Sequence, residues 1–295
     1  RAAEWQKPCP IFPHIPIKSK RLGEQLMTSR TEAGENELLY EANNGIGILT
    51  LNRPHRRNAL TFAMYEQIKQ ICARAGTDDD PDKLRVIILK GAGDAAFAAG
   101  TDISQFKTFS GEDDAIAYEQ MIEAVLHEIE YCEVPTIAAL NGFVTGGGAA
   151  IAASCSLRIG SRSVKVGVPI AKTLGNCLAI ANLKRFIALI GEARTAHILL
   201  TAQLIDAENA KLAGFITELL EDQSKVESRA MELAKSVVQS APLTIKATLT
   251  GIRRLREATP LPDDHDLIKM CFGSNDFKEG FTAFFEKRPA EWTGK

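Results

Sequence analysis

Two glycine-containing segments, some forty positions apart, carry the residues of this chain that are best suited to chemistry. The first is FAAGTDI at residues 97–103, and the second is NGFVTGGG at residues 141–148. Their small side chains leave backbone N–H groups open to a ligand. Two such groups that point at one oxygen atom form an oxyanion hole, which stabilises negative charge on an activated carbonyl. The pair of segments therefore predicts a site for a carbonyl compound.

Alternating strands and helices are expected to position these two segments. A hairpin turn is predicted at residues 43–45, where an Asn-Gly pair lies between two apolar runs. Further strand-like runs follow at residues 85–90, 135–140, 157–161 and 214–219. Helical patterns cover residues 61–75 and 149–153, and nearly all of the chain after Asn176. This order predicts an α/β fold with ligand-binding loops at strand ends.

Composition divides the chain into three parts. Residues 1–36 contain several prolines and a basic cluster but no periodic apolar face, so we expect an irregular arm or leader, with Met27 as a candidate natural start. The core is expected over residues 37–225. Residues 226–295 are expected to form a helical region that serves assembly and covers the site.

Overall composition is that of an ordinary soluble protein. The net charge is −2 and 24% of residues are charged, without the basic excess typical of nucleic-acid binding. No apolar run reaches the roughly 18 residues of a membrane span. Six cysteines lack a C-x-x-C pair and five histidines lack an H-x-x-x-H pair, which argues against disulfides and metal sites. We expect a cytoplasmic protein with no metal, nucleic-acid or membrane partner.

Several further motifs accompany the glycine segments in a characteristic order. They are LNRP at residues 51–54, NAL at residues 58–60, PTIAALNG at residues 135–142 and EGFTAFFEKR at residues 279–288. With these motifs the chain resembles the crotonase, or enoyl-CoA hydratase/isomerase, superfamily over about residues 37–295. The resemblance implies a spiral of ββα units, a helical C-terminal trimerisation region, and a homotrimer or homohexamer.

The resemblance also implies an acyl-CoA substrate and a lyase or isomerase of fatty acid metabolism. The thioester oxygen would accept hydrogen bonds from the backbone N–H groups of Thr101 and Gly147, which act as the catalytic oxyanion hole. Coenzyme A would enter as part of the substrate, with no tightly bound cofactor. Positions that match coenzyme A contacts in the family are Arg57, Ala59, Ala99, Ile103, Phe272 and Lys287.

Two positions depart from the pattern of the hydratases. Those enzymes use two carboxylates for proton transfer, each contributing about 10²- to 10⁴-fold to the rate. The matching positions here are Ala150 and Ile170, and neither side chain can transfer a proton. The resemblance therefore implies isomerase, hydrolase or decarboxylase chemistry ahead of hydration.

A substitute acid or base is sought on the helix before Pro135. Glu123 and His127 lie four residues apart and share one helix face. Alignment on Pro135 puts Glu123 near the position where a dehalogenase relative has a catalytic histidine, so Glu123 is our candidate catalytic acid/base. The alternative is structural, with Glu123 as a solvated residue and His127 as a packed one.

The segment around Asn176 and the residue Asp102 allow further alternatives. Asn176 is expected to cap the following helix. Alternatively Asn176, Thr173 or Cys177 contacts the acyl group, with Cys177 as a nucleophile near a helix N-terminus. Asp102 is expected to cap a short helix.

The leading hypothesis is an enzyme that stabilises a thioester enolate. A non-catalytic acyl-CoA-binding subunit, which kept the fold and lost the proton-transfer groups, is the alternative. RNA binding on the same scaffold is disfavoured because the chain has no dense stripe of Lys and Arg.

Overall fold

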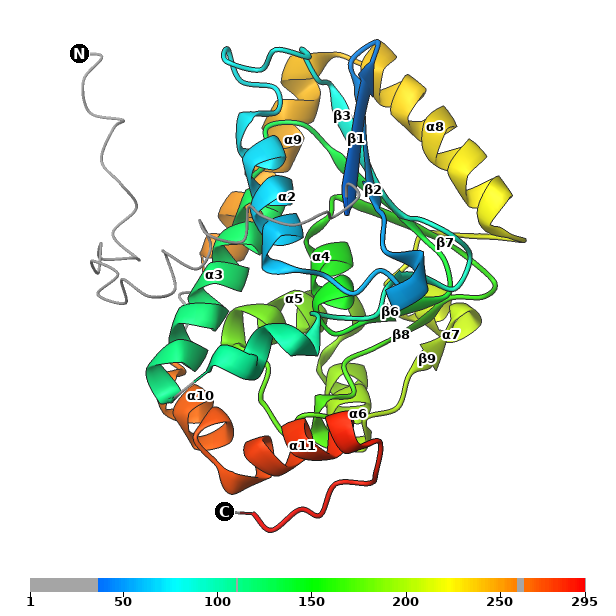
Figure 1. Ribbon diagram of the computed structural model, residues 1–295. Helices are drawn as coiled ribbons and strands as arrows, with labels where there is room; N and C mark the ends of the chain where they lie inside the picture. The colour runs from blue at the N-terminus through cyan, green and yellow to red at the C-terminus, as the bar shows by residue number, and fades with distance from the viewer. Residues whose placement is uncertain (1–36, 110, 259–262, 295) are drawn as a thin grey trace, which may run out of the picture.

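The computed structural model describes residues 37–109, 111–258 and 263–294 (Figure 1). The predicted N-terminal arm, residues 1–36, lies outside this described part. Among the described residues, no helix is long and apolar enough to span a bilayer. The same residues contain no group of three or more His, Cys, Asp or Glu side chains arranged to hold a metal ion.

A six-stranded sheet forms the centre of the α/β fold. Its strands lie in the order β1 (Leu38–Asn43), β2 (Ile46–Leu51), β3 (Val86–Gly91), β5 (Thr136–Leu140), β7 (Leu157–Ser161) and β10 (Glu218–Leu220). The hairpin of β1 and β2 is antiparallel, and the remaining pairs are parallel. The predicted turn is confirmed, since Asn44 (φ 51°) and Gly45 (φ 76°) both adopt the left-handed conformation that such a turn requires.

One predicted strand begins later than expected. Residues 214–217 are not part of β10, because they end the preceding helix α7 (Ala207–Ala213). Gly214 has φ 84° and donates its N–H to the carbonyl of Lys211, while Phe215 donates to the carbonyl of Ala210. These residues close a helix and bury Phe215, which leaves only the last residues of the run for sheet pairing.

A second, smaller sheet holds the two glycine-containing segments together. It consists of β4 (Ala96–Ala98), β6 (Phe143–Thr145), β8 (Lys165–Gly167) and β9 (Ile205–Asp206), in that order. Strands β4 and β6 are parallel neighbours. Because parallel strands end at the same edge, the residues that follow β4 and β6 are brought to one place.

Helices cover both faces of the six-stranded sheet (Figure 1). Helices α2 (Phe62–Arg74), α3 (Glu112–Glu130) and α4 (Gly147–Ser154) lie over one face, and α8 (Gln223–Gln239) lies over the other. Apolar side chains of α8 pack on Ile88, Ile137 and Ile159 of the sheet. Burial on both faces explains why the central strands read as continuous apolar runs rather than alternating ones.

The remaining described elements are mostly helical. They are η1 (Pro54–Arg56), η2 (Ile103–Thr108), η3 (Ile170–Lys172), α5 (Ile180–Ile190), α6 (Glu192–Thr201), α9 (Pro242–Glu257), α10 (His265–Phe272) and α11 (Asn275–Glu286). The predicted start of the C-terminal region, residue 226, falls in the first turn of α8. Helix α9 buries none of its residues.

Candidate oxyanion site

The two glycine-containing segments touch each other at their glycines. A methyl group added to Gly146 would lie 3.3 Å from the Cα atom of Gly100, and one added to Gly100 would lie 4.0 Å from the backbone nitrogen of Gly147. Both Gly100 (φ 103°) and Gly146 (φ 53°) adopt positive φ angles that favour glycine. Thr101 and Gly147, the next residue in each segment, are therefore neighbours, as predicted.

The N–H groups of Thr101 and Gly147 are available to a ligand. Neither donates a backbone hydrogen bond within the described residues. On either side of Thr101, Gly100 accepts a hydrogen bond from the N–H of Leu60 and Asp102 donates one to the carbonyl of Leu60, both at 2.8 Å, so the Thr101 peptide is held while its N–H stays unused. Gly147 is the first residue of α4, where N–H groups have no intrahelical partner and the helix dipole is positive.

Two tyrosine hydroxyls lie beside this pair and were not anticipated from the sequence. The Thr101 Oγ1 atom is 2.9 Å from the Tyr65 hydroxyl and 2.9 Å from the Tyr118 hydroxyl. A Cβ atom at position 147 would come within 2.0 Å of the Tyr65 hydroxyl, so only glycine fits there. Burial raises the pKa of both tyrosines, which keeps the hydroxyls neutral and able to donate hydrogen bonds.

An aromatic cluster fixes the ring of Tyr118. Ring centroids lie 4.9 Å away for Phe106, 5.9 Å for Phe109 and 6.4 Å for Phe272. Phe272, a predicted coenzyme A contact, is thus buried within this cluster of the described chain. The sequence offered one signal for these two tyrosines: each carries a hydroxyl group on a helix face that is otherwise apolar.

Two other predicted coenzyme A residues, Arg57 and Ala99, meet on one rim of the site. The N–H of Ala99 donates to the carbonyl of Arg57 at 3.0 Å, which joins the two loops. Ala59 and Ile103 lie two and four residues along the chain from this contact. The exposed Arg57 guanidinium lies 5.1 Å from the ring centroid of Phe143. Lys287 lies elsewhere, exposed at the C-terminal cap of α11.

Asp102 has the structural role that was predicted. Its carboxylate accepts a hydrogen bond from the N–H of Ser104 at 3.1 Å and so caps η2. It also pairs with Arg53 at 2.9 Å. Burial opposes ionisation of Asp102, but the hydrogen bonds from Ser104 and Arg53 outweigh burial and lower its pKa. A carboxylate held in this way is a poor proton acceptor.

Ala150 and Ile170, which stand where the hydratases have catalytic carboxylates, are apolar residues in apolar surroundings. Ala150 is buried inside α4, and Ile170 lies in η3, where it packs against the main core. Neither position offers a group that could orient water or transfer a proton.

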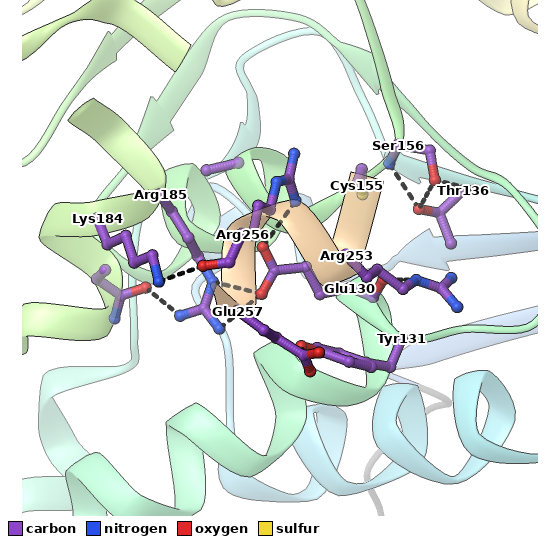
Figure 2. A network of polar contacts seen from close by, with 12 residues as sticks. Glu130, Tyr131, Thr136, Cys155, Ser156, Lys184, Arg185, Arg253, Arg256 and Glu257 are labelled. Carbon is purple, nitrogen blue, oxygen red and sulfur yellow. Dashed lines mark hydrogen bonds and ion pairs between the residues drawn. The ribbon is translucent and has the colours of Figure 1, made fainter. Parts of the chain in front are cut away.

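Glu123 is engaged in an ion pair. Its two carboxylate oxygens each accept a hydrogen bond from Arg185 of α5 at 2.6 Å. Arg185 also bonds to Glu130, which in turn pairs with Arg256 of α9 at 2.9 Å (Figure 2). His127, one turn further along α3, stacks on the ring of Tyr131 with centroids 4.0 Å apart. These contacts join α3, α5 and α9.

Glu119, one turn before Glu123, was not singled out from the sequence. It follows Tyr118 directly and is 9% exposed. Burial raises its pKa to about 8, with the nearby charges of Asp264 and Glu123 acting in the same direction. Its position four residues from Glu123 on the same helix is the signal that could have pointed to it.

The prediction that Asn176 caps a helix is wrong. Helix α5 begins at Ile180, four residues later, and the N–H of Ile180 donates to the distant carboxylate of Asp264 at 2.6 Å. Asn176 instead donates to the carbonyl of Cys177, and its buried Oδ1 atom has no hydrogen-bond partner among the described residues. Thr173 donates to the carbonyl of Pro169.

Cys177 lacks the environment of a nucleophile. Its thiol lies 3.7 Å from the carbonyl of Leu267 in α10. Burial, and then the neighbouring Cys271, raise the pKa of this thiol. Reactive cysteines have lowered pKa values, so these surroundings favour an inert thiol.

A hollow of about 670 Å³ adjoins the rim that carries Arg57. It begins at Phe143, whose ring contacts both Arg57 and Lys165, and it extends to Arg194 and His197 of α6. A second hollow, of about 370 Å³, lies between α11 and the C-terminal segment. Neither hollow includes Thr101 or Gly147.

Comparisons with known proteins agree with the fold and the motifs. A family model described as Enoyl-CoA hydratase/isomerase matches residues 41–295. The short-chain-enoyl-CoA hydratase of Clostridium acetobutylicum is 32% identical over 262 residues, covering 87% of this chain and 97% of the relative.

Solved structures show the same architecture. The crystal structure of an enoyl-CoA hydratase/carnithine racemase from Magnetospirillum magneticum has a TM-score of 0.70 and 30% identity, covering 89% of this chain and 97% of that one. A methylmalonyl-CoA decarboxylase has a TM-score of 0.78 at 23% identity, over 88% of this chain and 98% of that one, and it shares the fold. The chain therefore belongs to the enoyl-CoA hydratase/isomerase family, within the crotonase superfamily.

Proposed function

We propose that this protein is an enzyme that binds an acyl-CoA thioester and stabilises its enolate with the backbone N–H groups of Thr101 and Gly147. The observation that carries the proposal is the pair of unused N–H groups, side by side at the ends of β4 and β6. Removal of one such donor typically costs about 3 to 4 kcal/mol of transition-state stabilisation. The enoyl-CoA substrates named for the relatives support a thioester as the carbonyl compound.

The chemistry proposed is isomerisation, hydrolysis or decarboxylation rather than hydration. Hydration needs two proton-transferring groups, and Ala150 and Ile170 supply neither. Double-bond migration needs only one group that removes a proton and returns it. We therefore place isomerisation first among the three reactions.

Coenzyme A is proposed to lie along the rim formed by Arg57, Ala59, Ala99 and Ile103. The exposed Arg57 guanidinium is suited to a phosphate group, because it presents several N–H donors in a fixed plane. Lys287 is proposed as a further phosphate contact, and Phe272 as support for the site through its packing on Tyr118. Coenzyme A enters as part of the substrate.

Assembly into a homotrimer or homohexamer is part of the proposal. Helix α9 buries none of its own residues and exposes Leu243, Ile252 and Leu255. Large apolar side chains gathered on one helix favour contact with another subunit.

A non-catalytic acyl-CoA-binding subunit is the second candidate. It is favoured by the two apolar residues at the hydratase positions and by the ion pair that engages Glu123. This candidate predicts binding of the thioester without any change to it.

Mass spectrometry of CoA thioesters incubated with the protein in D2O tests the proposal. The panel should include crotonyl-CoA, 3-hexenoyl-CoA and saturated hexanoyl-CoA. Deuterium uptake or product formation would support enolate chemistry and name the substrate class. Tight binding with intact, unlabelled thioesters would favour the binding subunit, and no binding at millimolar concentration would contradict both.

A further inference from the structure

Glu119 is a largely buried side chain, 9% exposed, whose carboxyl makes no ion pair or hydrogen bond with the described part of the chain. Among the described residues, three other Asp, Glu, Lys or Arg side chains are similarly buried, and each has partners: Asp80 accepts from three backbone N–H groups, Arg158 donates to backbone carbonyls, and Arg185 pairs with glutamates. For Glu119 the described residues provide no hydrogen bond and no ion pair. Buried carboxyls without partners are costly, so one that persists calls for a functional explanation.

The neighbours of Glu119 place it beside the oxyanion site. It follows Tyr118, whose hydroxyl is 2.9 Å from Thr101 Oγ1. After burial, the charge of Glu119 is among the causes that raise the pKa of both the Tyr65 and Tyr118 hydroxyls, so the carboxyl lies within electrostatic reach of both. These hydroxyls bond to Thr101, and the Tyr65 hydroxyl also lies against Gly147. The two tyrosines thus link the carboxyl, through electrostatics and the chain neighbour Tyr118, to the two proposed N–H donors.

The groups packed around Glu119 favour its protonated form. On α3 these are Tyr118 and Glu123, of which Glu123 is paired with Arg185. The charge of Glu119 also acts on the Tyr65 hydroxyl of α2 and on the Cys177 thiol in the loop before α5, and the charge of Asp264, at the start of α10, acts on Glu119. Burial first, and then the charges of Asp264 and Glu123, raise the pKa of Glu119 to about 8. A carboxyl with a pKa near working pH can both remove and return a proton.

We propose that Glu119 is the catalytic acid/base of this site, an inference that rests on the proposed function. The ionised carboxylate removes a proton from the carbon next to the thioester carbonyl of a 3-enoyl-CoA. The C–H electron pair becomes the new C=C bond of the dienolate, and its oxygen is held by Thr101 and Gly147. The protonated Glu119 then gives a proton to the far carbon of the dienolate, which forms the 2-enoyl-CoA and restores the carboxylate. In D2O, exchange of the carboxyl proton with solvent before this step places deuterium in the product.

The test compares three variants with 3-hexenoyl-CoA and hexanoyl-CoA in D2O. Glu119→Gln is expected to slow isomerisation and deuterium exchange by about 100-fold or more, with the affinity for hexanoyl-CoA retained. Glu119→Asp should restore part of the rate. Glu128→Gln, the same substitution elsewhere on α3, is the matched control and should stay within about threefold of the unmodified protein.

The outcomes separate this inference from the proposed function. If the unmodified protein binds the thioesters but neither isomerises nor labels them, the enzymatic proposal fails. If it does react and Glu119→Gln reacts equally fast, only the assignment of Glu119 is overturned.

A pH profile gives a second, independent measurement should Glu119→Gln fold poorly. In the unmodified protein the exchange rate should rise with pH through about pH 8, because the carboxylate form removes the proton. Glu119→Asp should change the pH at which the exchange rate rises. A profile that is flat between about pH 6 and pH 10, or that is the same in the aspartate variant, overturns the assignment.

Discussion

The Tyr65 hydroxyl lies so close to the Cα atom of Gly147 that a Cβ atom at this position would come within 2.0 Å of it. The side chain of Tyr65 in α2 and the backbone of Gly147, the proposed oxyanion donor, are therefore packed against each other, and neither can move without displacing the other. Since Gly147 begins α4, any displacement here moves the N–H that the proposal uses.

Gly147→Ala is expected to reduce kcat by about 100-fold, because the added methyl group must displace Tyr65 or the backbone of α4. Tyr65→Phe removes the clashing oxygen, although the ring carbon that carried it would still lie 3.4 Å from the methyl group. The double variant should therefore be more active than Gly147→Ala alone. Steady-state kinetics of the four proteins measures this coupling, and additive effects would contradict the contact.

Thr101→Val is expected to destabilise the protein by roughly 1 to 3 kcal/mol, because two buried tyrosine hydroxyls lose their shared partner. Thr101→Ser keeps the hydroxyl and should retain most of the stability. Urea unfolding gives the free energies. Equal stabilities of the valine and serine variants would show that the hydroxyl contacts contribute little.

Glu123→Gln is expected to lower the free energy of unfolding by about 2 kcal/mol, because Arg185 loses one of its two carboxylate partners while staying buried. Its kcat should be unchanged, since the carboxylate is engaged by Arg185. Arg185→Lys should be destabilised by a similar amount, because lysine cannot donate the paired hydrogen bonds that Arg185 makes to the two oxygens of Glu123. A large loss of kcat in Glu123→Gln with normal stability would instead support Glu123 as the acid/base.

Stability should depend on the ionisation of Glu119. Its folded pKa of about 8 lies above the usual value of 4.5, so the folded state binds the extra proton between these pH values. The free energy of unfolding should therefore fall as pH rises from about 4.5 to about 8. The loss is on the order of 4 kcal/mol relative to Glu119→Gln, which lacks this ionisation. Urea titrations of both proteins at several pH values measure the difference, and parallel pH dependences would contradict it.

Asp264→Asn tests whether the charge of Asp264 raises the pKa of Glu119. The substitution removes a negative charge that raises the pKa of Glu119, while the amide oxygen can still accept from the N–H of Ile180. The rise in exchange rate should move to lower pH, with a stability loss of at most about 1 kcal/mol. Asp264→Ala should show the same shift and a larger stability loss. An unmoved pH profile would show that Asp264 does not act on the catalytic ionisation.

Features set by a few neighbouring residues were predictable from the sequence. Asn44 and Gly45 specify the hairpin because both can adopt positive φ angles, and Asp102 caps η2 because its side chain reaches the N–H of Ser104, two residues on. The two glycine-containing segments also singled out Thr101 and Gly147, the proposed donors, which lie side by side in the structure. In each case the interaction lies within a short stretch of chain, or the residue follows a glycine just after a strand ends.

Features set by partners distant in sequence were decided only by the tertiary structure. Glu119 and Glu123 are the same residue type on one helix, yet Arg185 of α5 pairs with Glu123, while Glu119 has no partner among the described residues. The first N–H of α5 donates to Asp264, 84 residues further along the chain, and not to Asn176, which was predicted to cap this helix. Periodicity shows which helix face is buried, but the ionisation of a buried carboxyl depends on which charges fold against it.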